Sequence, residues 1–273
     1  MRYTILYIIL FSFLSGLSQD TDSVNSNVFT KGLFMGKGKF EVKVFNNLYT
    51  ETGPYNNKLD KRSSFLSSFT QITIGSNKKI NFGIDAIYRS SVNNDSPTSS
   101  PLSVFEFKNE TNSQTLDSTL FITEKTHGLS HLGGRVRLKL FKDYRFTVQQ
   151  SIYLPLSLGG NYIVNTDLFF EHINKANTFM LFGDLGVWYP FKQAPFVYAK
   201  IFMGTFISKK VGVYAMLNLP YEAGGGIKFF VLPKLELELL YTKWLPIDAI
   251  VGGKNPSTFN LGIRYTNFSN FNK

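Results

Sequence analysis

The stretch Leu235-Glu236-Leu237-Glu238-Leu239-Leu240-Tyr241 alternates apolar and acidic side chains over most of its length. Because neighbouring side chains on a β-strand point to opposite faces, this segment presents leucines on one face and glutamates on the other. A soluble sandwich would bury the apolar face against a second sheet. A membrane barrel turns that face to lipid and keeps the polar face in its lumen.

Twelve segments of the chain alternate in this way, and tight polar turns separate many of them. They have 9–15 residues, and a tilted strand needs about 9–11 to cross a bilayer. The predicted strands are 38–50, 64–75, 79–91, 128–141, 145–155, 162–173, 177–191, 195–207, 211–219, 222–231, 235–245 and 257–268.

The connections between these segments alternate in length. Counted from the first strand, the even connections are short and the odd ones are longer or more variable. Outer-membrane barrels have this asymmetry, with short periplasmic turns and longer external loops. We therefore predict an all-β fold over 38–268, a single antiparallel transmembrane β-barrel of about 12 strands with both termini periplasmic.

The longest connection, 92–127, is rich in Ser, Asn, Thr and Pro, and its segment 102–107 alternates like a strand. We expect a solvent-side hairpin that extends the barrel wall, with a segment folded across the mouth as the alternative. Connections of this length are commonly functional or mobile.

The N-terminus has one positive charge at Arg2, an almost wholly apolar run over 5–14 and small residues after it. This pattern predicts a signal peptide over 1–18. A transmembrane anchor is the alternative, but the run is too short for ~30 Å of hydrocarbon. Residues 19–37 are predicted to form a disordered lead-in, and 269–273 a C-terminal tail.

Composition narrows the class of protein further. The chain has no cysteine, which excludes a lipid-anchored cysteine and disulfide bonds. Aromatic residues make up 16% of the chain, as suits the aromatic girdles of a barrel. The net charge is +10, but an exported protein rarely meets nucleic acid. We expect a cell outer membrane location, with outer-membrane lipid and lipopolysaccharide as partners and no nucleic acid.

Charges of both signs occupy the phase of the strands that we assign to the lumen, because Arg or Lys on the lipid face near the midplane costs ~2–4 kcal/mol. They fit either a polar pore or a network of ion pairs that fills the lumen. Arg135, Arg137 and Lys139 place three cations on one strand face and would favour anions unless neighbouring acids neutralise them. The predicted lumen lining is Glu41, Lys43, Asp85, Arg89, Arg135, Arg137, Lys139, Arg145, Asp167, Glu171, Asp184, Lys200, Lys228, Glu236, Glu238 and Arg264.

Bulky side chains in the same inward phase argue against a wide pore, since they narrow the bore. They are Phe45, Phe169, Phe182, Trp188, Tyr198 and Phe202.

Residues for catalysis or metal binding are few. His127 and His131 are expected on one face of their strand, but a metal site needs three or four converging ligands. Ser130 and His131 are residue types used in hydrolysis, yet adjacent strand positions point to opposite faces. We predict no catalytic activity, no cofactor and no metal.

The last strand carries an assembly signal. Phe259, Leu261, Ile263 and Tyr265 are spaced by two and end on an aromatic residue, whereas Phe268 is out of phase. This spacing resembles the C-terminal strand signal that the barrel-insertion machinery reads, so we expect that machinery as a partner.

Three segments resemble outer-membrane barrel proteins of the Bacteroidota type. They are Gly36-Lys37-Gly38-Lys39-Phe40, 234–242 and 258–265. The resemblance covers nearly the whole mature chain and implies the barrel architecture. Members of this group are mostly uncharacterised, some are labelled transporters, and no catalytic motif carries over to this sequence.

Together these patterns favour a narrow passive channel or transporter for small polar or amphipathic solutes. The alternative is a plugged structural or surface-interaction barrel that acts through the 92–127 connection. An enzyme that modifies outer-leaflet lipid is a third possibility.

Overall fold

The computed structural model describes eleven stretches of the chain, which together form thirteen strands and a 3-10 helix. The described residues are 34–55, 59–77, 79–116, 119–141, 146–156, 161–173, 179–191, 193–208, 210–219, 222–245 and 256–267. The strands are β1 Phe40–Tyr55, β2 Leu59–Gly75, β3 Ile80–Asp95, β4 Glu110–Leu116, β5 Thr119–Lys139, β6 Phe146–Pro155, β7 Ile163–Ile173, β8 Phe179–Pro190, β9 Phe196–Ser208, β10 Val211–Leu219, β11 Glu222–Leu232, β12 Leu235–Trp244 and β13 Ser257–Thr266. The helix, η2, is Pro101–Glu106.

Twelve of the strands close into an antiparallel barrel, as the alternation predicts. Strands that are consecutive in sequence pair with each other, except that β3 skips β4 and pairs directly with β5, and β1 pairs with β13 to close the barrel. Closure removes the free sheet edges, which satisfies the backbone hydrogen bonds that a bilayer cannot. β4 is the extra strand and pairs only with β5 among the described strands. The predicted strand bounds agree closely from β6 to β13.

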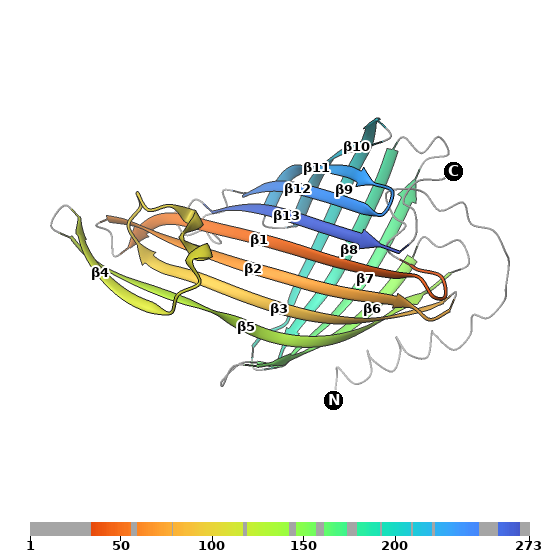
Figure 1. The fold of residues 1–273 in the computed structure, drawn as a ribbon, viewed down its shortest axis with the longest axis horizontal. Helices are drawn as coiled ribbons and strands as arrows, with labels where there is room; N and C mark the ends of the chain where they lie inside the picture. The colour runs from red at the N-terminus through yellow and green to blue at the C-terminus, as the bar shows by residue number, and fades with distance from the viewer. Residues whose placement is uncertain are drawn as a thin grey trace.

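One side of the barrel is much taller than the other (Figure 1). β1, β2, β3 and β5 have 16, 17, 16 and 21 residues, more than the 9–11 that cross a bilayer. The hairpin of β4 and β5 therefore projects beyond the barrel. We call this the loop end, and the opposite end, where the short connections such as 76–79 and 233–234 lie, the turn end.

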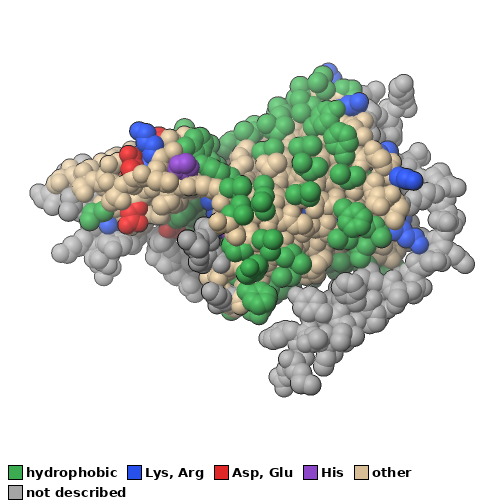
Figure 2. Space-filling model, turned by 60° about the horizontal axis from the view of Figure 1, so that its bottom comes forward, with side chains coloured by type: hydrophobic (Ala, Val, Ile, Leu, Met, Phe, Trp, Pro, Cys, Tyr) green, Lys and Arg blue, Asp and Glu red, His purple; other side chains and the backbone are tan. Residues whose placement is uncertain are grey.

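The outer face of the barrel wall is apolar. On β2, Ile72 and Ile74 are 42% and 54% exposed, and nearer the loop end the same face carries Thr70 and Ser68. Figure 2 shows hydrophobic side chains spread over the barrel wall, with charged side chains gathered at the two ends. An apolar band that ends in polar residues is the exterior of an outer-membrane barrel. No helix among the described residues is long and apolar enough to cross a membrane.

The prediction of a strand-like segment at 102–107 is wrong. Pro101 begins η2 there, and the Ser100 hydroxyl accepts a hydrogen bond from the Leu102 amide. η2 packs on β2 and β3, where Val104 is buried against Leu66 and Val92 on the outward face. Val104 thus covers the wall above the lipid band, whereas Leu102, Phe105 and Phe107 stay exposed. The hairpin that extends the wall begins later, at β4.

The residues just before β1 turn against the inner face of the barrel at the turn end. The Gly38 amide donates to the Gly75 carbonyl oxygen at 3.1 Å, and Met35 is 1% exposed. A side chain at position 75 would overlap the Gly36 carbonyl, so only glycine permits this approach. Met35 thus occupies space inside the turn end of the barrel. The predicted signal peptide and C-terminal tail lie outside the described residues.

Candidate functional site: the barrel lumen

The lumen encloses a cavity of about 300 Å³ that extends from Glu41 near the turn end to Glu222 at the loop-end limit of β11. Its wall carries charged and aromatic side chains from both halves of the chain. Of the residues predicted to line the lumen, the cavity is lined by Glu41, Lys43, Arg137, Lys200, Lys228, Glu236, Glu238 and Arg264. The alternation of the strands brings these residues together from β1, β5, β9, β11, β12 and β13.

A first network of charges crosses the seam where the first and last strands meet. Arg264 on β13 pairs with Glu41 on β1 and with Glu236 on β12, at 3.1 Å for the latter. Lys228 on β11 lies 3.0 Å from Glu236 and 3.4 Å from Glu238. All but Lys228 have side chains that are at most 12% exposed. This seam network fills part of the lumen with paired charges.

The opposite wall carries a second network. Arg135 Nη1 lies 3.1 Å from Asp85 Oδ1, and the Tyr153 hydroxyl donates to the other carboxylate oxygen of Asp85. Arg137 donates to the Gln149 side-chain oxygen at 2.7 Å, and the Gln149 amide donates to Asp167 at 3.0 Å. Arg135 is therefore paired, and Arg137 is linked through an amide to a carboxylate.

Neighbouring acids balance two of the three cations of β5, which the sequence suggested would favour anions if they were unpaired. Asp85 neutralises Arg135, and Asp167 lies one hydrogen-bonded side chain away from Arg137. Lys139 lies at the turn-end limit of β5 and is half-buried. The cluster is thus not an unpaired anion-selective ring.

Other predicted lining residues lie apart from these networks. Asp184 on β8 is opposite Lys200 on β9 in the strand register, and the Lys200 ammonium lies 4.6 Å from the centre of the Tyr198 ring. Glu171 is half-buried on β7. Arg89 is exposed near the loop end, away from the cavity. Arg145 lies outside the described residues.

A row of aromatic rings narrows the lumen between these charges. Phe169, Phe182, Phe202 and Tyr214 come from four successive strands, β7 to β10, with ring centres 5.8, 5.6 and 5.9 Å apart. Aromatic pairs at such separations attract each other beyond the effect of their buried area. The row therefore forms a packed aromatic constriction on one side of the lumen, where Phe182, Phe202 and Tyr214 line the cavity.

The neutral polar partners of the charges were not anticipated from the sequence. Gln149, Tyr153, Tyr198 and Tyr214 all hydrogen-bond to a lumen charge. Their inward phase on the strands is readable, but alternation does not show which inward residue lies opposite a given carboxylate. Register between strands decides this, and register is a tertiary property.

A β-bulge corrects two expectations about β5. The pairing with β3 shifts between Leu129 and His131, which leaves Ser130 as the extra residue. The Ser130 hydroxyl and His131 Nδ1 consequently lie 3.1 Å apart, although adjacent residues on a regular strand would diverge. His127 lies on the opposite face from His131, because the bulge shifts the phase between them.

The hydrogen bonds of Ser130 and His131 to backbone carbonyl groups stabilise the bulge. The Ser130 hydroxyl donates to the Ile87 carbonyl at 3.0 Å, and His131 Nε2 lies 3.2 Å from the Asn161 carbonyl oxygen. Among the described residues, no carboxylate hydrogen-bonds to His131, and no cluster of His, Asp and Glu could hold a metal ion.

The projecting hairpin carries a partly exposed charge cluster. The Lys125 ammonium on β5 lies 2.6 Å from Glu106 of η2 and 3.0 Å from Glu110 of β4. These hydrogen bonds raise the pKa of Lys125, while the bond from Lys125 lowers the pKa of Glu110. The cluster ties η2 to the hairpin beyond the membrane-spanning part of the barrel.

No family model matches the sequence, and no curated protein matches it significantly. The fold is similar to that of an outer-membrane channel from Pseudomonas putida F1, with a TM-score of 0.51, 11% identity and coverage of 90% of this chain and 99% of that one. The toluene transporter TodX of Pseudomonas putida gives a TM-score of 0.47 at 10% identity, over 94% and 96% of the two chains. The translocator domain of the autotransporter NalP from Neisseria meningitidis gives 0.45 at 9% identity, over 97% and 95%. At these identities the likeness shows the fold alone, that of an outer-membrane β-barrel.

Proposed function

We propose that this barrel is a narrow passive channel for small polar or amphipathic solutes. The observation that carries the proposal is the lumen cavity of about 300 Å³, bounded by paired charges and aromatic rings. A cavity of this size is at the lower end of the range for small-molecule sites, roughly 300–1,000 Å³. The Pseudomonas putida F1 protein of similar fold is described as an outer-membrane channel, which supports the proposal.

The wall chemistry favours solutes that are small and of mixed polarity. Ion pairs such as Arg135 with Asp85 leave little net field, so neither sign of charge is strongly excluded. The ring faces of Phe182 and Phe202 offer apolar contact at the constriction. A solute with both a polar and an apolar part can therefore replace its hydration with contacts to the wall.

Conductance in planar lipid bilayers tests this proposal on the full-length, refolded protein. We expect small, stable current steps from the wild type. Phe182→Ala should increase the single-channel conductance severalfold, since it removes one ring from the constriction. Leu185→Ala is the matched control, because Leu185 lies on the same strand but is 51% exposed on the lipid face, and its conductance should equal that of the wild type. Equal conductance in all three proteins would place the constriction outside the conduction path.

A plugged barrel that acts through its projecting loops is the second candidate. The paired lumen charges and the buried Met35 favour it, and so does the ordered assembly of η2, β4 and β5 at the loop end. A protein that shows folded, heat-modifiable migration in gels but no conductance, even with Phe182→Ala, would exclude the channel and support this candidate.

A further inference from the structure

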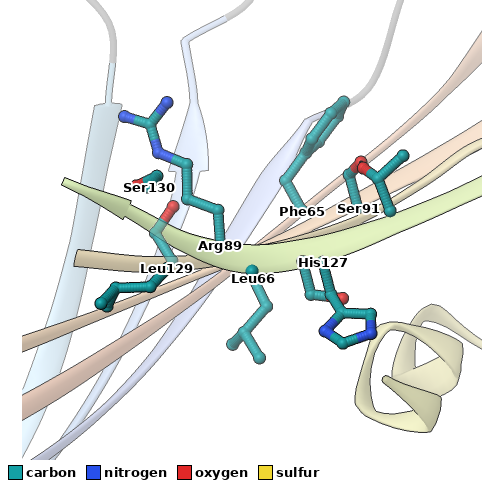
Figure 3. A pocket seen from close by; sticks show the side chains of 11 residues that line it. Phe65, Leu66, Arg89, Ser91, His127, Leu129 and Ser130 are labelled. Atoms are coloured by element: carbon teal, nitrogen blue, oxygen red, sulfur yellow. The ribbon is translucent and has the colours of Figure 1, made fainter. Parts of the chain in front are cut away.

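A second hollow, of about 480 Å³, lies at the loop end, apart from the lumen cavity. It is built by β2, β3 and β5, where the wall rises above the barrel. Figure 3 shows the side chains of Arg89 and Phe65 on one side of the wall and those of Leu66 and His127 on the other. Arg89 and Phe65 share the inward phase with Asp85 and Gln71, so their side is the luminal one.

Arg89 is a cation without a counter-ion. Within the described part of the chain it forms no ion pair and no hydrogen bond, and it is exposed to the hollow. Its cross-strand neighbours in register are Ser67 on β2 and Gly128 on β5, neither of which is acidic. The nearest acid in the same phase of β3, Asp85, is held by Arg135 and Tyr153. The positive charge of Arg89 is therefore available to a ligand.

The floor of the hollow beside Arg89 is open and carries hydroxyl groups. A side chain built at Gly128 would meet nothing within 4 Å, so the space opposite Arg89 is empty. Next along the wall, the hydroxyls of Ser91 and Thr126 lie 2.8 Å apart, and the one that accepts this hydrogen bond can donate its own to a ligand in the hollow. A guanidinium with nearby hydroxyls is a good receptor for an oxyanion, because each contact to the charged group is a charge-assisted hydrogen bond.

Beyond the hydroxyls the mouth becomes aromatic. Phe65 lies 5.8 Å from Tyr49, ring centre to ring centre, and Tyr49 lies 5.8 Å from Trp244. These three rings form a shelf from β2 to β12, and Phe65 is the ring of the shelf that lines the hollow itself. Acids on this face lie on both sides of the site: Glu51 accepts a hydrogen bond from Tyr49 at 2.7 Å at the far part of the shelf, and Glu124 lies two residues from Thr126 on the same face of β5. A ligand that reaches along the shelf must be apolar there, since a second negative group would face Glu51.

From these contacts we propose that the hollow captures amphipathic monoanions, with one carboxylate on Arg89 and an apolar, preferably aromatic, body on the Phe65–Tyr49–Trp244 shelf. The assignment rests on the proposed channel function, because it names the solute class that would be collected at the channel mouth. Inorganic polyanions suit the site poorly, as they would gain the contact to Arg89 and lose the shelf.

Binding of benzoate to the full-length protein in detergent, measured by calorimetry, tests the site directly. Arg89→Gln should weaken binding roughly tenfold or more, as expected for the loss of a charge-assisted hydrogen bond. Arg89→Lys should restore part of the affinity. Arg62→Gln is the matched control, since Arg62 is also a loop-end arginine but bonds to Thr52 outside the hollow, and its affinity should be unchanged. Unaltered gel migration of Arg89→Gln would show that the barrel is folded.

Two further ligands complete the test. Benzamide, the neutral analogue, should bind much more weakly than benzoate, and inorganic phosphate should compete only at far higher concentration. Equal binding of benzamide, competition by phosphate at the benzoate concentration, or unchanged affinity in Arg89→Gln would each overturn the proposal. The two proposals fail separately: benzoate binding without bilayer conductance removes the channel and keeps the site, whereas conductance without benzoate binding removes the site alone.

Discussion

The lumen cavity and the luminal side of the hollow at the loop end are both built from the inward phase of the strands, yet their charges are arranged differently. In the lumen, Arg135 and Arg264 are less than 10% exposed and each has a carboxylate partner. At the loop end, Arg89 is exposed and has no partner among the described residues. Burial explains the difference, because a buried charge must be paired whereas an exposed one is stabilised by water.

We propose that the paired and the unpaired charges have different roles in the barrel. The paired charges hold the wall together across strand boundaries and leave a nearly neutral path, while the unpaired charge is left to attract solute. The following predictions test the contrast, beginning with the largest expected effect.

Removal of a lumen cation should destabilise the barrel strongly. Arg264→Ala leaves Glu41 and Glu236 buried without their common partner at the seam of β1 and β13, and breaking such a pair costs ~3–5 kcal/mol. We expect a large fall in the temperature at which the folded band converts to the unfolded band in gels. Arg89→Ala at the mouth is the comparison and should change that temperature little. Equal shifts in the two variants would contradict the division between paired and unpaired charges.

Neutralising the cations of β5 should change ion selectivity without closing the channel. In Arg135→Gln/Arg137→Gln, Asp85 and Asp167 lose their balancing charges, so the reversal potential should move toward cation selectivity at low salt. At 1 M salt the screening length is ~3 Å, and the shift should shrink.

The control for the double arginine variant removes both members of the Asp85–Arg135 ion pair. Asp85→Asn/Arg135→Gln changes no net charge, so selectivity should match that of the wild type. An unchanged reversal potential in the double cation variant, with conductance intact, would mean that these residues do not face the path of the ions.

The smallest effect is expected at the exposed charges of the projecting hairpin. Because the hydrogen bond from Lys125 lowers the pKa of Glu110, their contribution is present above the ordinary glutamate pKa and is lost as the pH falls through the lowered one. Hydrogen-exchange protection of β4, corrected for intrinsic rates, should therefore fall slightly under acid conditions, since exposed pairs contribute little. Lys125→Gln should abolish this pH dependence, and its persistence in that variant would assign the effect to other groups.

Most of the barrel could be predicted from alternation, and the exceptions have identifiable causes. From β6 to β13 the strand bounds agree within two residues, because each strand has one face in lipid and one in the lumen. The 92–127 connection departs from the prediction, since β3 and β5 continue above the lipid band and apolar residues there cover other protein. Val104 packs against Leu66 on the outward face, so its pattern indicated a strand where η2 forms.

The lumen was predictable as a set of residues but not as a set of contacts. Inward phase alone selected Glu41, Asp85, Arg135 and Arg264, whereas the pairing of Arg264 with Glu41 joins residues 223 positions apart. The closeness of Ser130 and His131 likewise depends on a bulge that periodicity does not reveal. The predicted assembly role of Phe259, Leu261, Ile263 and Tyr265 stays a prediction, although all four lie exposed on the outer face of β13.

Local alternation of side chains, a property of each strand alone, was enough to specify an antiparallel barrel with an apolar exterior and a charged interior. Closure of β1 on β13 and of β3 on β5, together with the stagger between neighbouring strands, decided which charges meet and which stay free. The physical reason is that the two-residue period assigns a side chain to a face, whereas its neighbours on that face come from strands whose register is set only when the whole sheet closes.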